Sequence, residues 1–141
     1  MLRDTATCEA NHRRFITRVA ESEKVWALRN PEGYAVCDSN DDPDRSVLLF
    51  WSDRAYAKRA VETEFPDFRP STITLFDFIF RWLPGMSREG DLVATNWAGD
   101  LAGLEMDPLD VQEQLTDALS QERRAKYSAR LRQAIAEEHN E

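Results

Sequence analysis

The sequence predicts a single α+β domain with a mixed, mostly antiparallel sheet and helices packed on it. Three observations support this fold class. The chain has 141 residues, which is the usual length of one domain. Its apolar residues recur at helical spacing in some stretches and as short extended runs in others. The predicted order of helices and strands has a hairpin near each end, and hairpins favour an antiparallel sheet over a doubly wound parallel one.

The first half of the chain predicts two helices around three strands. Residues 7–24 form a helix, and residues 25–28 and 34–37 form a hairpin whose turn contains Pro31 and Gly33. A polar loop follows. The continuous apolar run 47–51 then indicates a strand covered on both faces.

The helix expected from Asp53 to about Phe65 begins directly after this strand, capped by Ser52 or Asp53. Its apolar positions predict an inward face, and its charged positions predict an outward face. The inward set is Tyr56, Ala57, Ala60, Val61 and Phe65, and the outward set is Arg54, Lys58, Arg59 and Glu62.

In the second half, we expect a short strand over 71–74 and a capping box from Thr74 to Asp77. The helix that this box opens should end near Leu83, before Pro84. Strands over 92–95 and 101–106 come next. Asp107 and Pro108 then begin a last helix that reaches the end of the chain.

The resulting order is α-β-β-β-α-β-α-β-β-α. We divide the chain into a globular domain over 1–121 and a charged helical tail over 122–141. We expect this tail to project from the body or to fray.

Charge excludes several classes of partner. Acidic residues outnumber basic ones by 26 to 18, so the net charge is −8. Nucleic acids and anionic membranes attract clustered basic residues, so we expect neither as a partner. No apolar run is long enough to span a bilayer. Two cysteines are too few for a disulfide framework, which favours a cytoplasmic protein.

Residues capable of catalysis or metal binding are few and scattered. We interpret His12 as a structural side chain on an apolar helix face, Cys37 as a small buried one, and Ser52 as a helix cap. Asp38, Asn40 and Asp42 alternate as in a calcium loop, but Pro43 and Leu49 stand where that loop needs Gly and Glu. We therefore expect no catalytic residue, no metal site and no cofactor.

Polar groups and a large aromatic side chain converge only in the loop 96–100. Asn96 and Asp100 flank Trp97 there, and Trp51 and Tyr56 are further candidates for lining a small ligand pocket. The alternative is an ordinary turn in which Trp97 covers the core.

The helix over 75–83 is apolar around most of its circumference, whereas packing on one sheet needs only a stripe. One explanation is an interaction surface that includes Phe76, Phe80 and Leu83, used by a protein partner or a second copy. The other is that the C-terminal helix packs over it through leucines, namely Leu109, Leu115 and Leu119.

Several short segments together resemble a bacterial family called domain of unknown function 2750. The similarity covers about residues 10–115 and is carried by residues 25–28, 32–35, 49–53, 56–57, 92–97 and 103–105. This resemblance implies a compact cytoplasmic α+β domain and assigns no activity. From the residues, the leading hypothesis is a non-enzymatic protein-interaction domain of a regulatory or antagonist type. The alternative is a small-molecule binder or cryptic enzyme that uses the Asn96–Asp100 loop.

Overall fold

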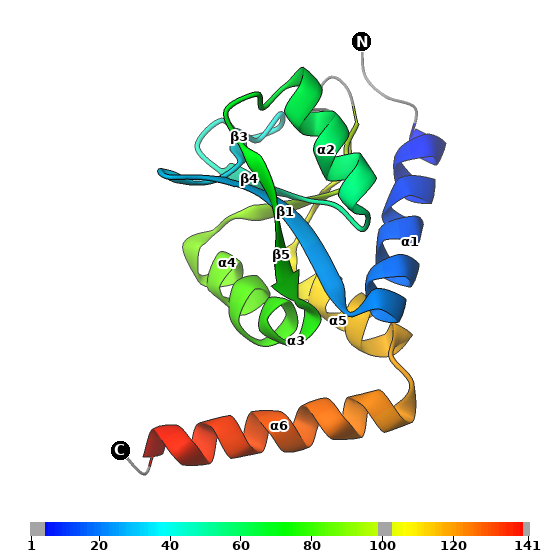
Figure 1. Cartoon of the computed structure of the whole chain (residues 1–141), viewed down its shortest axis with the longest axis vertical. Helices are drawn as coiled ribbons and strands as arrows, with labels where there is room; N and C mark the ends of the chain where they lie inside the picture. The colour runs from blue at the N-terminus through cyan, green and yellow to red at the C-terminus, as the bar shows by residue number, and fades with distance from the viewer. Residues whose placement is uncertain (1–4, 99–102, 140–141) are drawn as a thin grey trace.

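Two small sheets, joined edge to edge, form the centre of the protein in a computed structural model that describes residues 5–98 and 103–139 (Figure 1). The α+β class is confirmed. The elements, in order, are α1 (Thr5–Ser22), β1 (Lys24–Asn30), β2 (Gly33–Tyr34), β3 (Val36–Asp38), β4 (Ser46–Phe50), α2 (Arg54–Thr63), β5 (Arg69–Thr74), α3 (Leu75–Asp77), the π-helix η1 (Phe78–Trp82), α4 (Leu83–Glu89), β6 (Leu92–Thr95), β7 (Glu105–Met106), α5 (Pro108–Ala118) and α6 (Gln121–His139).

The first sheet has the order β2-β1-β5 and is antiparallel throughout. The second has the order β3-β4-β6-β7, and only its β4–β6 pair is parallel. Trp26 and Trp51 connect the two sheets, since each backbone N–H donates to the other's carbonyl oxygen at 2.8 Å. Pairing is therefore mostly antiparallel, as expected, but it is divided between two sheets.

The stretch over 34–37, expected to be one hairpin strand, belongs to both sheets. Tyr34 pairs with Arg29 in the first sheet, and Val36 pairs with Leu48 in the second. Ala35 lies between them, 2% exposed, and its N–H donates to the carbonyl of Leu28 at 2.9 Å. A small side chain is suited to this position because the chain crosses here between two packed sheets.

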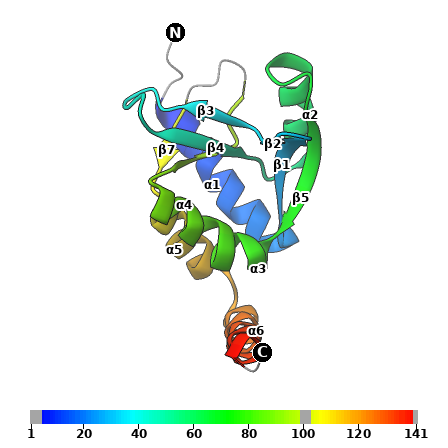
Figure 2. The same ribbon diagram turned by 90° about the vertical axis from the view of Figure 1, so that its left-hand side faces the viewer.

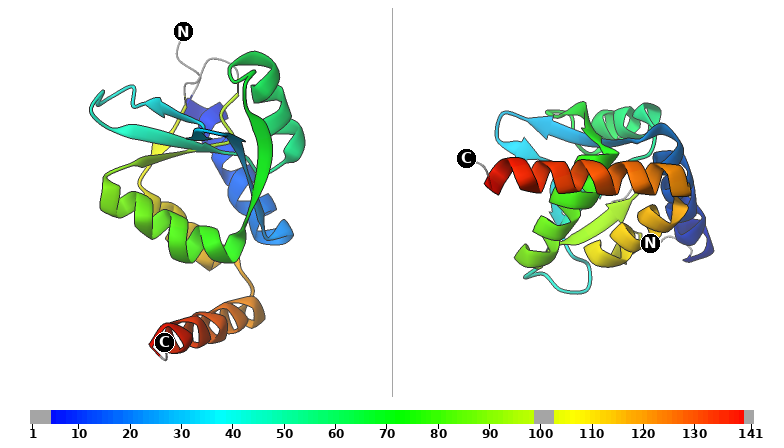
Figure 3. Two further views of the ribbon diagram at one scale, coloured as in Figure 1. Left: turned by 60° about the vertical axis from the view of Figure 1, so that its left-hand side comes forward. Right: turned by 90° about the horizontal axis from the view of Figure 1, so that it is seen from below.

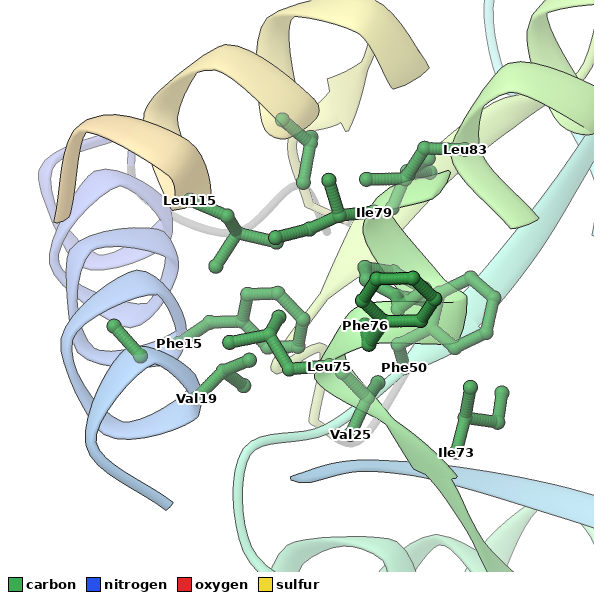
Figure 4. Packing of buried hydrophobic residues seen from close by; sticks show 14 of the residues in the cluster. Phe15, Val19, Val25, Phe50, Ile73, Leu75, Phe76, Ile79, Leu83 and Leu115 are labelled. Carbon is green, nitrogen blue, oxygen red and sulfur yellow. The ribbon is translucent and has the colours of Figure 1, made fainter. Parts of the chain in front are cut away.

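Strand β4 is covered on both faces, as its apolar run predicted. Phe50 points into the larger core, with α1, α5 and the helical segment 75–89, and Figure 4 shows it among these side chains. Leu49 and Trp51 point to the opposite side, into a second core that contains Ala57 of α2. Helices thus lie on both sides of β4 (Figure 2).

The helix that begins at Leu75 does not end before Pro84, contrary to expectation. It passes through the π-helix η1 and continues as α4 to Glu89. In η1 the N–H of Leu83 donates to the carbonyl of Phe78, five residues back. The same spacing pairs the carbonyl of Ile79 with residue 84, but Pro84 has no N–H to donate. Gln112 of α5 supplies the missing donor, with Nε2 2.8 Å from the Ile79 oxygen.

The C-terminal helix is also interrupted, where one continuous helix was expected. Leu119 is extended at ψ 146° and buried, and the Ser120 hydroxyl accepts a hydrogen bond from the N–H of Arg123 to start α6. Helix α6 then runs across the lower side of the body (Figures 1 and 3). It is helical to His139.

The strand expected over 101–106 is reduced to Glu105–Met106, and residues 101 and 102 lie outside the described residues. Among the described helices, none combines the length and apolar character needed to cross a membrane.

Candidate functional site

A pocket of about 260 Å³ lies where α1, α2 and the loop after β6 meet. Four of the five residues expected to bind a ligand line it, namely Trp51, Tyr56, Asn96 and Trp97. The fifth, Asp100, lies outside the described residues. Residues far apart in sequence therefore form one concave site, whose remaining walls are Asn11, Arg14, Arg59, Ala60, Thr63, Glu64 and Ala98.

Asn96 holds the segments around the pocket together. Its backbone is in the left-handed region at φ 53°, which asparagine tolerates better than most residues. Its Oδ1 accepts the N–H of Ser52 at 2.8 Å, and its Nδ2 donates to the Ser52 hydroxyl at 3.0 Å and to the carbonyl of Asn11 at 3.3 Å. Asn96 is 5% exposed, and these bonds give it a structural role at the floor of the pocket.

Both tryptophans have their indole N–H groups occupied. Trp51 Nε1 donates to the carbonyl of Trp97 at 2.8 Å, and Trp97 Nε1 donates to the carbonyl of Leu104 at 2.9 Å. A Cβ atom at Gly103 would stand 2.7 Å from Trp97 Nε1, so this glycine lets the chain pass against the ring. The tryptophans are only 1% and 5% exposed, so they mainly complete the second core and give the pocket a fixed floor without free donors.

Asp53 occupies the N-cap position of α2, but its side chain makes no capping hydrogen bond. Instead its Oδ2 lies 2.8 Å from Arg18 Nη1 of α1, and that nitrogen also donates to the Tyr56 hydroxyl at 3.0 Å. The bond to Asp53 raises the pKa of Arg18 above its usual value. The Ser52 hydroxyl donates to Asp53 Oδ1 at 2.5 Å, so it does not cap the helix either. Asp53 thus connects α1 to the start of α2, and Ser52 connects Asp53 to Asn96.

Two arginines on the rim were not expected to belong to a site. Arg59 was assigned to the solvent face of α2; it is exposed, but its guanidinium carbon lies 5.9 Å from the centroid of the Tyr56 ring. Arg14 of α1 donates to the Asn11 side chain at 3.0 Å. Within the described part of the chain, neither arginine has a carboxylate at ion-pair distance, unlike Arg18.

The residues with catalytic potential are engaged elsewhere. His12 is buried; its Nδ1 lies 2.7 Å from Thr95 Oγ1 and its Nε2 lies 2.5 Å from Gln114 Oε1, which agrees with a structural role. Cys37 is half-buried, and burial, followed by the charges of Glu105 and Asp38, raises the pKa of its thiol.

A raised pKa disfavours the reactive thiolate of Cys37 at neutral pH. Among residues 5–98 and 103–139, no group of three or more His, Cys, Asp or Glu side chains is placed to hold a metal ion.

The expected interaction surface on the apolar helix is mostly inside the molecule. Leu83 is fully buried and Phe76 is 4% exposed, while Phe80 is half-buried. Leu115 contributes to the same core, but Leu109 remains 48% exposed. Tyr127 of α6, rather than Leu109, covers Phe76 and Phe80, with ring centroids at 5.7 Å and 6.4 Å. The apolar circumference is thus accounted for by helices on more than one side.

Fold and pocket together define a small α+β domain with an aromatic cavity and an arginine-bearing rim. The chain belongs to the family described as "Protein of unknown function (DUF2750)", whose model matches residues 12–115. This match confirms the resemblance seen in the sequence, and it includes every described wall of the pocket except Asn11. No curated protein and no solved structure matches the chain.

Proposed function

We propose that this protein is a binding protein whose ligand is a small organic anion with a flat apolar body, held in the pocket between α1 and α2. The observation that carries the proposal is the pair Arg14 and Arg59. Both guanidinium groups line the pocket without a carboxylate partner among the described residues, in a chain whose net charge is −8. Guanidinium groups bind carboxylates in a fixed, often bidentate geometry.

The floor of the pocket supports an apolar ligand body. The half-buried Tyr56 ring lines the pocket, and Trp51 and Trp97 are almost fully buried against it with their polar atoms bonded to the backbone. A volume of about 260 Å³ is at the small end of ligand pockets, so the ligand is a metabolite-sized molecule. Glu64 also lines the pocket, and its negative charge would weaken the binding of an anion.

Calorimetry with benzoate and benzamide tests this proposal, since the two probes have the same ring and differ in charge. We expect benzoate to bind more tightly. Arg59→Met should weaken benzoate binding by roughly 10- to 100-fold, because a hydrogen bond to a charged group contributes about 1.5–3 kcal/mol. Glu64→Gln should strengthen it.

Arg54→Met is the matched control, because Arg54 is an exposed arginine on the same helix that does not line the pocket. Equal binding of benzoate and benzamide, or equal effects of the two arginine variants, would refute the proposal.

A protein-interaction role of a regulatory or antagonist type is the second candidate, and the acidic charge favours it. An acidic surface attracts basic partners through interactions that salt screens. We expect such a partner to be retained from lysate at low salt and lost at high salt. The same retention at both salt concentrations would contradict an electrostatic partner. A cytoplasmic location remains part of both proposals and is supported by the two free cysteines.

A further inference from the structure

Helix α6 is anchored to the body through one half only. Tyr127 is 7% exposed, and its hydroxyl donates to Glu23 Oε1 at 2.5 Å. Arg130 is held nearby, with its guanidinium carbon 4.2 Å from the centroid of the Phe76 ring. Leu131, one turn after Tyr127, is half-buried, and Ile135, one turn further, is 45% exposed. An apolar line on α6 therefore continues past the point where the body covers it.

A groove of about 310 Å³ lies beside the anchored half, between η1, α5 and α6. Phe80, Leu119 and Tyr127 form its apolar wall. Glu113 and Asp117 of α5 and Arg124 and Ser128 of α6 line it as well. Ile135 follows Ser128 by seven residues, which is about two helical turns, so both lie on one side of the helix. The same side of α6 thus offers an apolar groove in one half and an exposed apolar side chain in the other.

The charges on this side are arranged symmetrically about Leu131. Arg124 precedes Leu131 by seven residues and Glu138 follows it by seven, so all three share one helical stripe. The ends of α6 themselves suit the helix dipole, since Glu122 lies in the first turn and His139 in the last. Arg124 and Glu138 lie inside these end residues and are the charges that share a stripe with Leu131.

We propose that this face of α6 binds a second copy of the chain, with the two α6 helices antiparallel and crossing at Leu131. In this arrangement Ile135 of each copy enters the groove beside Tyr127 of the other, and Arg124 of each copy faces Glu138 of the other. A two-fold axis makes every contact twice, as in most homodimers. Figure 3 shows that α6 lies across the outside of the body.

Sedimentation velocity on the full chain, from about 1 µM to about 100 µM, tests the proposal. We expect a concentration-dependent dimer. Ile135→Asp should raise the dimer dissociation constant at least about tenfold, because it places a negative charge against apolar side chains and near the carboxylates of Glu113 and Asp117. Leu109→Asp is the matched control, since Leu109 is similarly exposed at 48% but lies on α5 outside the stripe. A monomer throughout the range, or equal effects of the two variants, would overturn the proposal.

Charge exchange gives a second and independent measurement. Arg124→Glu and Glu138→Arg should each weaken the dimer, because each places like charges opposite one another. The double variant restores opposite charges and should recover most of the lost affinity, which a non-specific effect on folding would not produce. Failure of the double variant to recover affinity, while all variants keep the wild-type melting temperature, would rule out the antiparallel arrangement.

Discussion

Replacing Asn96 with alanine removes the side chain that connects the loop after β6 to α1 and to the start of α2. Its amide makes three hydrogen bonds, to the N–H and hydroxyl of Ser52 and to the carbonyl of Asn11. The substitution leaves the N–H of Ser52 without an acceptor in a residue that is only 6% exposed. Alanine must also adopt the left-handed backbone conformation at φ 53°.

The magnitude follows from these contacts. A buried polar group left without its partner costs about 1–3 kcal/mol, so the lost hydrogen bonds together should cost about 2–4 kcal/mol. The left-handed conformation costs alanine about 1 kcal/mol more and costs glycine almost nothing. We therefore expect Asn96→Ala to lower the free energy of unfolding by about 3–5 kcal/mol, and Asn96→Gly to lower it by about 1 kcal/mol less.

Urea denaturation followed by tryptophan fluorescence measures these differences, and thermal unfolding should show a decrease in Tm of roughly 9–15 °C for the alanine variant. Asn40→Ala serves as the control, because Asn40 is exposed and such substitutions change stability by less than about 0.5 kcal/mol. An alanine variant as stable as this control would refute the structural role of Asn96. A glycine variant less stable than the alanine variant would refute the backbone argument.

Two further predictions concern the loop before β7 and the anchor of α6. Gly103→Ala places a Cβ atom 2.7 Å from Trp97 Nε1, and crowding of this kind destabilises a protein by about 1–3 kcal/mol. The Tm should therefore fall, and the tryptophan fluorescence should change. An unchanged Tm would contradict the close approach of Gly103 to the ring.

Burial and the hydrogen bond to Glu23 raise the pKa of Tyr127, so the folded protein keeps the phenolic proton above about pH 10, where the unfolded chain releases it. The free energy of unfolding should therefore fall as pH rises beyond about 10. Urea denaturation at alkaline pH should show a smaller fall for Tyr127→Phe than for the wild-type protein. An equal fall in the two proteins would contradict the role of Tyr127.

Features that depend on neighbouring residues could be predicted from the sequence. Asp107 accepts the N–H of Leu109 at 2.8 Å, as its position before Pro108 predicted. Thr74 accepts the N–H of Asp77 at 3.2 Å, which is the Thr74 half of the predicted capping box. These signals need no information about the rest of the fold, since a cap acts within one turn.

Features that depend on distant segments could not be predicted in the same way. The helix continues past Pro84 because Gln112, on another helix, donates to the Ile79 carbonyl. Residues 34–37 divide between two sheets because Tyr34 pairs with nearby Arg29, whereas Val36 pairs with Leu48 of the next strand, beyond the polar loop. Local propensity favoured the simpler alternatives, a helix end at the proline and one continuous strand.

The aromatic and amide residues that line the pocket were candidates from the sequence, whereas its charged rim was not predicted. Trp51, Tyr56 and Trp97 are conspicuous in the sequence because large aromatics often line ligand sites. Arg14 and Arg59, in contrast, have the pattern of solvated charges on amphipathic helices. Only the packing of α1 beside α2 brings these two charges to the same opening.

The π-helix η1 also affects how the chain length can vary. In a regular helix, adding or removing one residue rotates everything that follows by about 100°, which would turn Leu83 and Met86 out of the core. A π turn contains one residue more than a regular helical turn, so deleting the exposed Arg81 would restore regular α-helical hydrogen bonding. The helical turns before and after the deletion would keep their buried faces toward the core. Length differences among natural variants of this helix should therefore be found between Phe78 and Trp82.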